Sequence, residues 1–204
     1  MLHAALIKEC ADPSLKPAIV EQFIAAAGSP DPLSITVKSG GRLILVSKAR
    51  STKEAIEIIR QHADKAVVRV GLTQIPAGVG VKQLTDLKTD LIDACQNLRK
   101  GTAMFSKVLR IVAKWYGNPI SADVFPQIFD DAVYAWKTGE FEGVGVFQAE
   151  DPGNGMDMEN AARPTDDAGN GDSSPESETT ESPEQTQPIG SAEMRIDLSR
   201  IGGK

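Results

Sequence analysis

Apolar residues recur at helical spacing in the segment KPAIVEQFIAAA near the N-terminus. Pro17 suits a first helical turn, because the amide hydrogen that proline lacks would have no partner there. Gly28 follows the last apolar residue and is expected to end the helix. The apolar positions of this predicted helix are Ile19, Val20, Phe23, Ile24 and Ala27.

The pattern changes in SITVKSGGRLILVS, where β-branched residues lie on both sides of Ser39-Gly40-Gly41. Glycine adopts the positive φ angles of a tight turn without steric cost, so the segment predicts a β-hairpin. The later stretch AVVRVGL predicts a third strand. TQIPAGVGV follows as a loop or bulged edge, since Pro76 has no amide hydrogen to donate to a sheet.

Between these strands, Ser51 and Glu54 have the spacing of a capping box that opens the helix STKEAIEIIRQHAD. From Leu84 the pattern predicts a helix to about Lys100, a break at Gly101, and a second helix through Tyr116. A last helix, VFPQIFDDAVYAWK, is expected to be capped by Ser121 or Asp123 and closed by Thr138-Gly139. The order predicts an α+β fold: a small β-hairpin-containing sheet packed with about five helices.

The composition changes after Gln148. Residues 149–204 carry 13 Asp+Glu against 4 Lys+Arg, whereas residues 1–148 carry 15 against 18. The segment 149–190 is rich in Asp, Glu, Ser, Thr, Gly and Pro, and so it cannot bury enough apolar surface to offset the entropy lost on ordering. We therefore predict a folded α+β domain over 1–148 and a disordered acidic linker over 149–190.

The last residues, 191–204, differ again from the linker. In AEMRIDLSRIGGK, apolar and polar residues alternate as in a strand, yet Met194, Leu198 and Ile201 also suit one face of a helix. An apolar end beyond a solvated linker is typical of a short docking segment. Its candidate partner-docking residues are Met194, Ile196, Leu198 and Ile201.

The helix containing KVLRIVAKWYGNP carries the candidate nucleic-acid contacts Lys107, Arg110 and Lys114, which fall within roughly 60° of one another. Apolar residues, including Trp115 and Tyr116, cover much of the remaining surface. Three interpretations remain open: a core helix with solvated cations, a stripe that contacts phosphates, and a protein-binding face. The near-neutral domain and the acidic tail favour the first interpretation over the second.

Residues for catalysis are sparse. His3 lies near the terminus, and His62 falls on the apolar side of a short helix, as a structural histidine would. Cys10 and Cys95 show no metal-binding or redox spacing, so we expect two buried thiols in a reducing compartment, with a disulfide as the less favoured alternative. The repeated GVGV lacks the remaining residues of a nucleotide-binding loop. The sequence thus predicts no enzyme activity, no catalytic residue, no cofactor and no metal. With no apolar run of spanning length or secretory signal, it also predicts a cytoplasmic location.

Several segments together resemble a known family: ECADPSLKPAIVEQFIAAAGSPDPL, TVKSGGRLILV, AVVRVGLTQIPAGVGV, NLRKGTAMFSKVLRIVAKWYGNP and FPQIFDDAVYAWKTGEFEGVGVFQAEDPG. They are similar to the small conjugal transfer protein TraH of Ti-type and rhizobial conjugative plasmids, over about residues 8–153. The resemblance implies an accessory role in plasmid DNA transfer, beside a relaxase and a type IV secretion channel. It implies no catalytic residues. We expect a non-enzymatic accessory that acts through protein contacts, with a DNA-binding accessory as the alternative.

Overall fold

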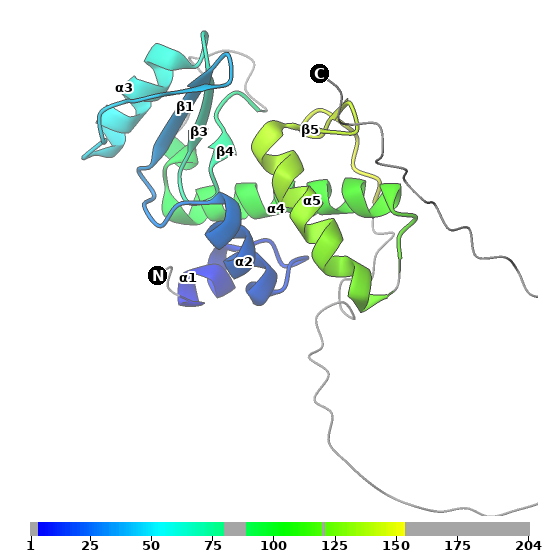
Figure 1. Ribbon diagram of the computed structural model, residues 1–204. Helices are drawn as coiled ribbons and strands as arrows, with labels where there is room; N and C mark the ends of the chain where they lie inside the picture. The colour runs from blue at the N-terminus through cyan, green and yellow to red at the C-terminus, as the bar shows by residue number, and fades with distance from the viewer. Residues whose placement is uncertain (1–3, 80–88, 120, 154–204) are drawn as a thin grey trace, which may run out of the picture. The chain divides into compact units, whose positions relative to one another are not determined.

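The computed structural model describes residues 4–79, 89–119 and 121–153. The described α-helices are α1 (Ala4–Cys10), α2 (Pro17–Ala27), α3 (Thr52–His62), α4 (Ala94–Trp115) and α5 (Phe125–Thr138). Short 3-10 helices η2 (Thr89–Leu91) and η3 (Ala122–Val124) precede α4 and α5. The strands are β1 (Ile35–Ser39), β2 (Arg42–Ile44), β3 (Val67–Val70), β4 (Ile75–Pro76), β5 (Glu140–Phe141) and β6 (Val144–Gly145). The prediction of an α+β fold with a small hairpin-containing sheet and about five helices is confirmed (Figure 1).

The described residues continue past the predicted domain boundary at 148 and end at Gly153. The rest of the predicted linker, up to residue 190, lies outside them. The predicted docking segment, 191–204, also lies outside them.

The main sheet is antiparallel, with strand order β2-β1-β3-β4. Gly40 and Gly41 form the β1–β2 turn with φ angles of 54° and 77°, as the hairpin prediction required. Pro76 lies in β4, which is an edge strand, so the missing amide hydrogen removes no bond from the middle of the sheet.

The two faces of this sheet are covered differently. One face carries Val37, Val68 and Val70, which are buried, and α3 packs against β1 and β3. The opposite face carries Arg69, whose guanidinium contacts the end of α5. Further along that second face, Val67 is exposed. The core is therefore continuous under α3, whereas the other face is covered only in part.

Asn97 of α4 fixes the turn between β3 and β4. Its side-chain amide donates to Val70 O and Leu91 O at 3.0 and 2.7 Å, and its carbonyl oxygen accepts from both donors of Thr73. Gly71 has a φ of +74°, and a Cβ there would lie 2.2 Å from the Asn97 Nδ2 atom. A buried asparagine and a glycine thus dock the sheet onto α4.

The predicted break at Gly101 is wrong, because α4 runs without interruption from Ala94 to Trp115. A Cβ on Gly101 would lie 2.1 Å from the Thr73 hydroxyl oxygen. Glycine is therefore required for close packing against the β3–β4 turn. The packing and the other helix-forming residues offset the cost of a glycine in a helix interior.

The centre of the core is aromatic. Phe23 of α2 stacks on Phe105 of α4 with a centroid distance of 3.9 Å, and the Trp136 ring of α5 meets both at steep angles. All three side chains are fully buried. The Trp136 indole nitrogen donates to Thr73 O at 3.1 Å, which satisfies its only polar group. The helices predicted from apolar spacing thus meet through their largest side chains.

The predicted helix caps are confirmed at some ends only. The Ser51 hydroxyl accepts from the Glu54 amide, but the Glu54 carboxylate accepts from the Arg50 amide instead of completing the box at Ser51. Gly139 ends α5 with a φ of 88°. Neither Ser121 nor Asp123 caps α5, because η3 intervenes and no side chain bonds at the N-cap.

Arg69 joins the sheet to the C-terminal end of α5. Its guanidinium donates to Trp136 O at 2.6 Å, to Lys137 O at 3.1 Å and to Gln74 O at 3.2 Å. It also lies 5.7 Å from the centre of the Phe147 ring. Burial lowers the pKa of Arg69 to about 10, so the group stays charged at neutral pH and faces the negative end of the helix dipole.

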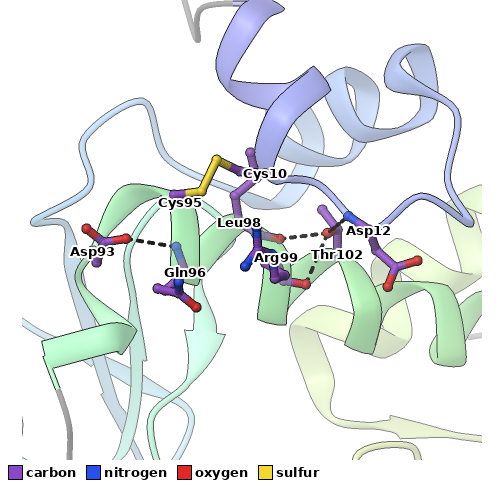
Figure 2. The surroundings of a disulfide bond; sticks show 8 residues. All are labelled: Cys10, Asp12, Asp93, Cys95, Gln96, Leu98, Arg99 and Thr102. Atoms are coloured by element: carbon purple, nitrogen blue, oxygen red, sulfur yellow. Dashed lines mark hydrogen bonds between the residues drawn. A yellow bond between two sulfur atoms is a disulfide. The ribbon is translucent and has the colours of Figure 1, made fainter.

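Cys10 and Cys95 form a disulfide bond (Figure 2). The prediction of two buried thiols is wrong, because α1 packs against α4 and brings the two Cα atoms within 5.1 Å. Figure 2 shows the bond beside the start of α4, where the Asp93 carboxylate accepts from the Gln96 amide, and near the Asp12 amide, which donates to Thr102 Oγ1. The prediction of a reducing compartment loses the support that it took from unpaired cysteines.

Candidate functional site

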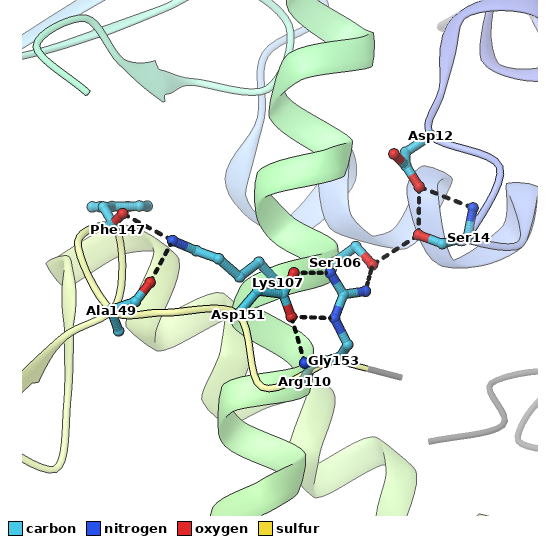
Figure 3. A network of polar contacts seen from close by, with 9 residues as sticks. All are labelled: Asp12, Ser14, Ser106, Lys107, Arg110, Phe147, Ala149, Asp151 and Gly153. Atoms are coloured by element: carbon cyan, nitrogen blue, oxygen red, sulfur yellow. Dashed lines mark hydrogen bonds and ion pairs between the residues drawn. The ribbon is translucent and has the colours of Figure 1, made fainter. Parts of the chain in front are cut away.

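Two of the three predicted nucleic-acid contacts, Lys107 and Arg110, lie on one side of α4, beside the segment 147–153 (Figure 3). The Lys107 ammonium donates to Phe147 O and Ala149 O, both at 2.9 Å. An ammonium that binds two carbonyls holds this last described segment against the helix. Lys107 therefore has acceptors within its own chain.

Arg110 holds the same segment through Asp151. The guanidinium Nε donates to Asp151 Oδ1 at 2.8 Å, Nη2 donates to the other carboxylate oxygen, and Nη1 donates to Ser106 Oγ at 2.6 Å. The Asp151 carboxylate also accepts from the Gly153 amide. The hydrogen bond from Arg110 lowers the pKa of Asp151, and the same bond raises the pKa of Arg110.

This polar network continues to the N-terminal part of the chain. Ser106 Oγ lies 2.8 Å from Ser14 Oγ, and the Ser14 hydroxyl donates to Asp12 (Figure 3). Three segments that are distant in sequence therefore meet on one side of α4. Most of the charge on this side is balanced inside the protein.

Lys114, the third predicted cation, is exposed near the end of α4. The predicted stripe is thus divided into two cations that bind residues 147–153 and one that faces solvent. For a phosphate to take the place of these acceptors, it would have to compete with a bidentate carboxylate and two carbonyls.

An exposed cluster of apolar side chains follows directly after Lys114. We define the aromatic patch as Trp115, Tyr116, Phe141 and Val144. Trp115 is 58% exposed, although its ring packs against Tyr116 and Phe141 at centroid distances of 5.0 and 5.6 Å. Phe141 and Val144 are paired residues of the β5–β6 hairpin, and Val144 is 52% exposed.

Polar groups surround and hold the aromatic patch. The Tyr116 hydroxyl donates to Asp131 Oδ2 at 2.6 Å, and this hydrogen bond raises the pKa of Tyr116. Glu142, in the hairpin turn, adds a nearby negative charge. The Glu142 φ angle is 48°, a strained value for a residue with a side chain. The tryptophan ring is therefore presented on a defined surface and not on a loose end.

The sequence pattern did not predict this patch. It assigned Trp115 and Tyr116 to the apolar side of a core helix, where burial would be expected. The sequence signal that marks their position is the stop at Asn118-Pro119, since residues in a last helical turn can lie beyond the core. The hairpin partner was not predicted, because the second GVGV was compared only with a nucleotide-binding loop.

The other features give no converging set of catalytic groups within the described residues. A groove of about 640 Å³ between α2 and α5 is lined by Ala18, Ile19, Ala26, Phe125 and Phe129 among others, and its charged lining residue is Asp130. In residues 4–79, 89–119 and 121–153, no three His, Cys, Asp or Glu side chains lie close enough together to bind a metal ion. His62 is half-buried at the end of α3, and His3 lies outside the described residues.

The predicted partner-docking residues Met194, Ile196, Leu198 and Ile201 lie outside the described residues. Among the helices that the structure describes, none has both the length and the apolar character that crossing a bilayer requires.

Two comparisons relate the chain to known proteins. The family model TraH_2 matches residues 1–203. A protein of Sinorhizobium fredii described as "Uncharacterized protein y4dP" is 68% identical over 203 residues, which cover 100% of both chains. No solved structure matches this chain. The TraH resemblance drawn from separate segments is therefore confirmed over the whole length, and it connects the protein with conjugal transfer. The chain belongs to the TraH_2 family.

Proposed function

We propose that this chain is a non-enzymatic accessory protein of conjugative plasmid DNA transfer. It binds other conjugal transfer proteins, such as a relaxase or a component of the type IV secretion channel, and it does so in the cytoplasm. Family membership supports the process. The observation that carries the mode of action is Trp115, a large apolar ring that is held by neighbours and yet exposed.

The aromatic patch has the properties of a protein-binding centre. Tryptophan and tyrosine are enriched among residues that contribute most to protein interfaces, and truncating such a residue costs about 2 kcal/mol or more of binding free energy. Contacts with Tyr116 and Phe141 restrict the Trp115 ring before any partner arrives. Less conformational entropy is then lost on binding.

The rim of the patch supports the same function. Lys114, Asp131 and Glu142 supply charges of both signs around the apolar centre. A polar rim around an apolar centre is the usual anatomy of a protein interface. Strain at Glu142 adds support, since strained backbone is concentrated at functional sites.

The alternative, DNA binding through Lys107, Arg110 and Lys114, has less support. Lys107 and Arg110 are engaged by acceptors in residues 147–153, and Asp151 adds a negative charge beside them. Non-specific DNA binding depends on cations that can neutralise phosphates. The protein-contact function therefore ranks first.

Trp115→Ala tests the proposed function. In a donor strain that carries the conjugative plasmid, we expect this variant to lower transfer frequency by about tenfold or more, the effect of losing a central interface residue. Because the ring is more than half exposed, the melting temperature of the purified variant should change little. Trp115→Phe is the matched control, and it should retain most of the transfer. Transfer at the parental level by a folded Trp115→Ala variant, at matched protein levels, would contradict the proposal.

A further inference from the structure

Two carboxylates lie beside the aromatic patch. Asp131 of α5 accepts from the Tyr116 hydroxyl at 2.6 Å and from the Gln127 side-chain amide at 3.3 Å. Glu142 is exposed in the β5–β6 turn. The hydrogen bond to Asp131 raises the pKa of Tyr116, and the negative charges of Asp131 and Glu142 add to this effect. Acids from two different elements therefore place negative charge at the Tyr116 side of the patch.

The neighbouring lysines do not cancel this charge. Lys114 lies four residues after Arg110, so it shares the Arg110 side of α4 and lies about 100° around the helix from Trp115. Lys137 follows Asp131 by six residues, which places it about 120° around α5. Within residues 4–79, 89–119 and 121–153, no ion pair involves Asp131 or Glu142. Both carboxylates thus remain available to a cation from outside the described residues.

The rings of the patch add a second attraction for a cation. Most of the surface of an indole belongs to its two faces, so the 58% exposure of Trp115 leaves part of a face open to solvent. Tyr116 and Phe141 meet this ring at interplanar angles of 75° and 83° and restrict its orientation. The face of an aromatic ring attracts cations, and tryptophan does so most strongly. The patch and its acids therefore favour a ligand group that is both flat and positively charged.

An arginine side chain has both properties. Its guanidinium is planar and weakly hydrated, it stacks on aromatic rings, and it forms bidentate bonds with carboxylates. We propose that the aromatic patch, together with Asp131 and Glu142, binds an arginine side chain in a basic segment of a partner protein. This inference rests on the proposed function and specifies the chemistry of the partner. Lysine supplies the charge without the planar group, so it should bind more weakly.

Other ligand groups fit the same surface less well. An acidic segment would bring like charges beside Asp131 and Glu142. A purely apolar segment would remove water from these carboxylates and supply no hydrogen-bond donor in return. Asp131 already accepts from Tyr116 and Gln127, but an ionised carboxylate has roughly four acceptor positions, so a guanidinium can still bind it.

The test is an NMR titration of the purified full-length protein, whose two tryptophans give two indole N–H signals. Trp136 is the internal reference, because it is fully buried and its indole donates to Thr73 O. The probe is the peptide acetyl-Gly-Arg-Gly-Arg-Gly-amide, and control peptides carry lysine, glutamine or glutamate in place of both arginines. We expect the arginine peptide to shift the Trp115 signal saturably and to leave Trp136 unchanged. The lysine peptide should bind more weakly, and the other two should cause no shift.

Single charge changes identify the carboxylates. Glu142→Gln and Asp131→Asn should each lower the affinity for the arginine peptide by about threefold or more, the effect of losing an exposed ion pair. An amide oxygen at residue 131 can still accept from Tyr116, so the patch keeps its support. Glu140→Gln is the matched control for the hairpin, because strand alternation places residue 140 on the opposite face from Phe141. Its affinity should equal that of the parent.

An absent Trp115 shift with the arginine peptide would overturn the inference, as would an equal shift with the glutamine or glutamate peptide. Equal affinity for lysine and arginine, or an unchanged affinity in both carboxylate variants, would overturn it as well. The transfer assay of Trp115→Ala judges the proposed function separately. If transfer falls but the titration fails, the patch is an interface whose partner is not basic. If the titration succeeds but transfer stays at the parental level, the arginine site stands and the proposed function is rejected.

Discussion

Two basic regions of this protein have opposite surroundings. On α4, Lys107 and Arg110 donate to carbonyls and a carboxylate of residues 147–153, so both cations have hydrogen-bond acceptors inside the chain. At the sheet edge, Arg42 is the first residue of β2, and Lys38 of β1 pairs with Leu43 of β2. Within the described part of the chain, no ion pair involves either of them.

The difference shows that the partner of a charge, and not the charge itself, determines whether a basic region is available for binding. The α4 cations Lys107, Arg110 and Lys114 lie at helical spacing, and this spacing made them candidate nucleic-acid contacts in the sequence. Lys107 and Arg110 hold residues 147–153 against α4, because the carbonyls of Phe147 and Ala149 and the carboxylate of Asp151 accept their hydrogen bonds. The cations beside β2 have no regular spacing, yet they accompany an edge that lacks a partner strand among the described residues.

Loss of the disulfide is expected to have the largest effect on stability. The bond joins α1 to α4, the helix that carries Lys107 and Arg110. Its two cysteines are 85 residues apart, so the bond removes many conformations from the unfolded chain. Reduction, or Cys10→Ser with Cys95→Ser, should lower the free energy of unfolding by about 2–5 kcal/mol. Denaturant unfolding followed by circular dichroism measures the loss. Equal stability of oxidised and reduced protein would contradict the prediction.

The same bond also tests the proposed location. Alkylation of thiols in freshly lysed donor cells, followed by mass spectrometry, reports whether Cys10 and Cys95 are paired. Because the cytoplasm keeps most thiols reduced, a stable disulfide in cells would argue against the cytoplasmic location.

Arg110→Gln tests the basic region of α4 that contacts residues 147–153. It removes the bond to Asp151, and since that carboxylate is 42% exposed, solvent screening limits the expected loss of stability to about 1 kcal/mol or less. Lys114→Gln is the matched control, with the same charge change at an exposed position of α4. Its stability should stay within error of the parent.

The loss caused by Arg110→Gln should depend on pH. The pKa of Asp151 is lowered in the folded state from its ordinary value of 3.8, so its contribution is fully present above that value and is lost as the pH falls through the lowered pKa. The stability difference between the parent and Arg110→Gln should therefore be largest near neutral pH and should shrink as the pH falls below about 4. A difference that grew in acid would show that another group is responsible.

DNA binding gives the smallest expected effect. Fluorescence anisotropy with a labelled duplex at moderate salt should show no micromolar affinity, because two of the three predicted contacts, Lys107 and Arg110, are engaged within the chain. Replacing Lys107, Arg110 and Lys114 by Gln should then leave the signal unchanged. Micromolar binding by the parent, with a log–log salt slope that falls by roughly 0.9 for each phosphate that the variant no longer neutralises, would reverse the ranking of the two functions.

Local chemistry determined the elements that the sequence predicted well. Gly40-Gly41 between β-branched runs specified the hairpin, because only positive φ angles close so tight a turn. Pro17 and Gly139 marked the start of α2 and the end of α5, because each has a backbone preference of its own. Apolar spacing identified the buried side of α2.

Tertiary structure alone decided three features that the sequence did not predict. Gly101 was predicted to break a helix but lies inside one, because Thr73 from a distant turn occupies the space of its missing side chain. Cys10 and Cys95 became partners through the packing of α1 on α4. Trp115 is exposed, although Val112 and Ala113 in the same last turn of α4 are fully buried. Each outcome depends on which residues from distant parts of the chain contact a given side chain. Local spacing in the sequence carries no information about these contacts.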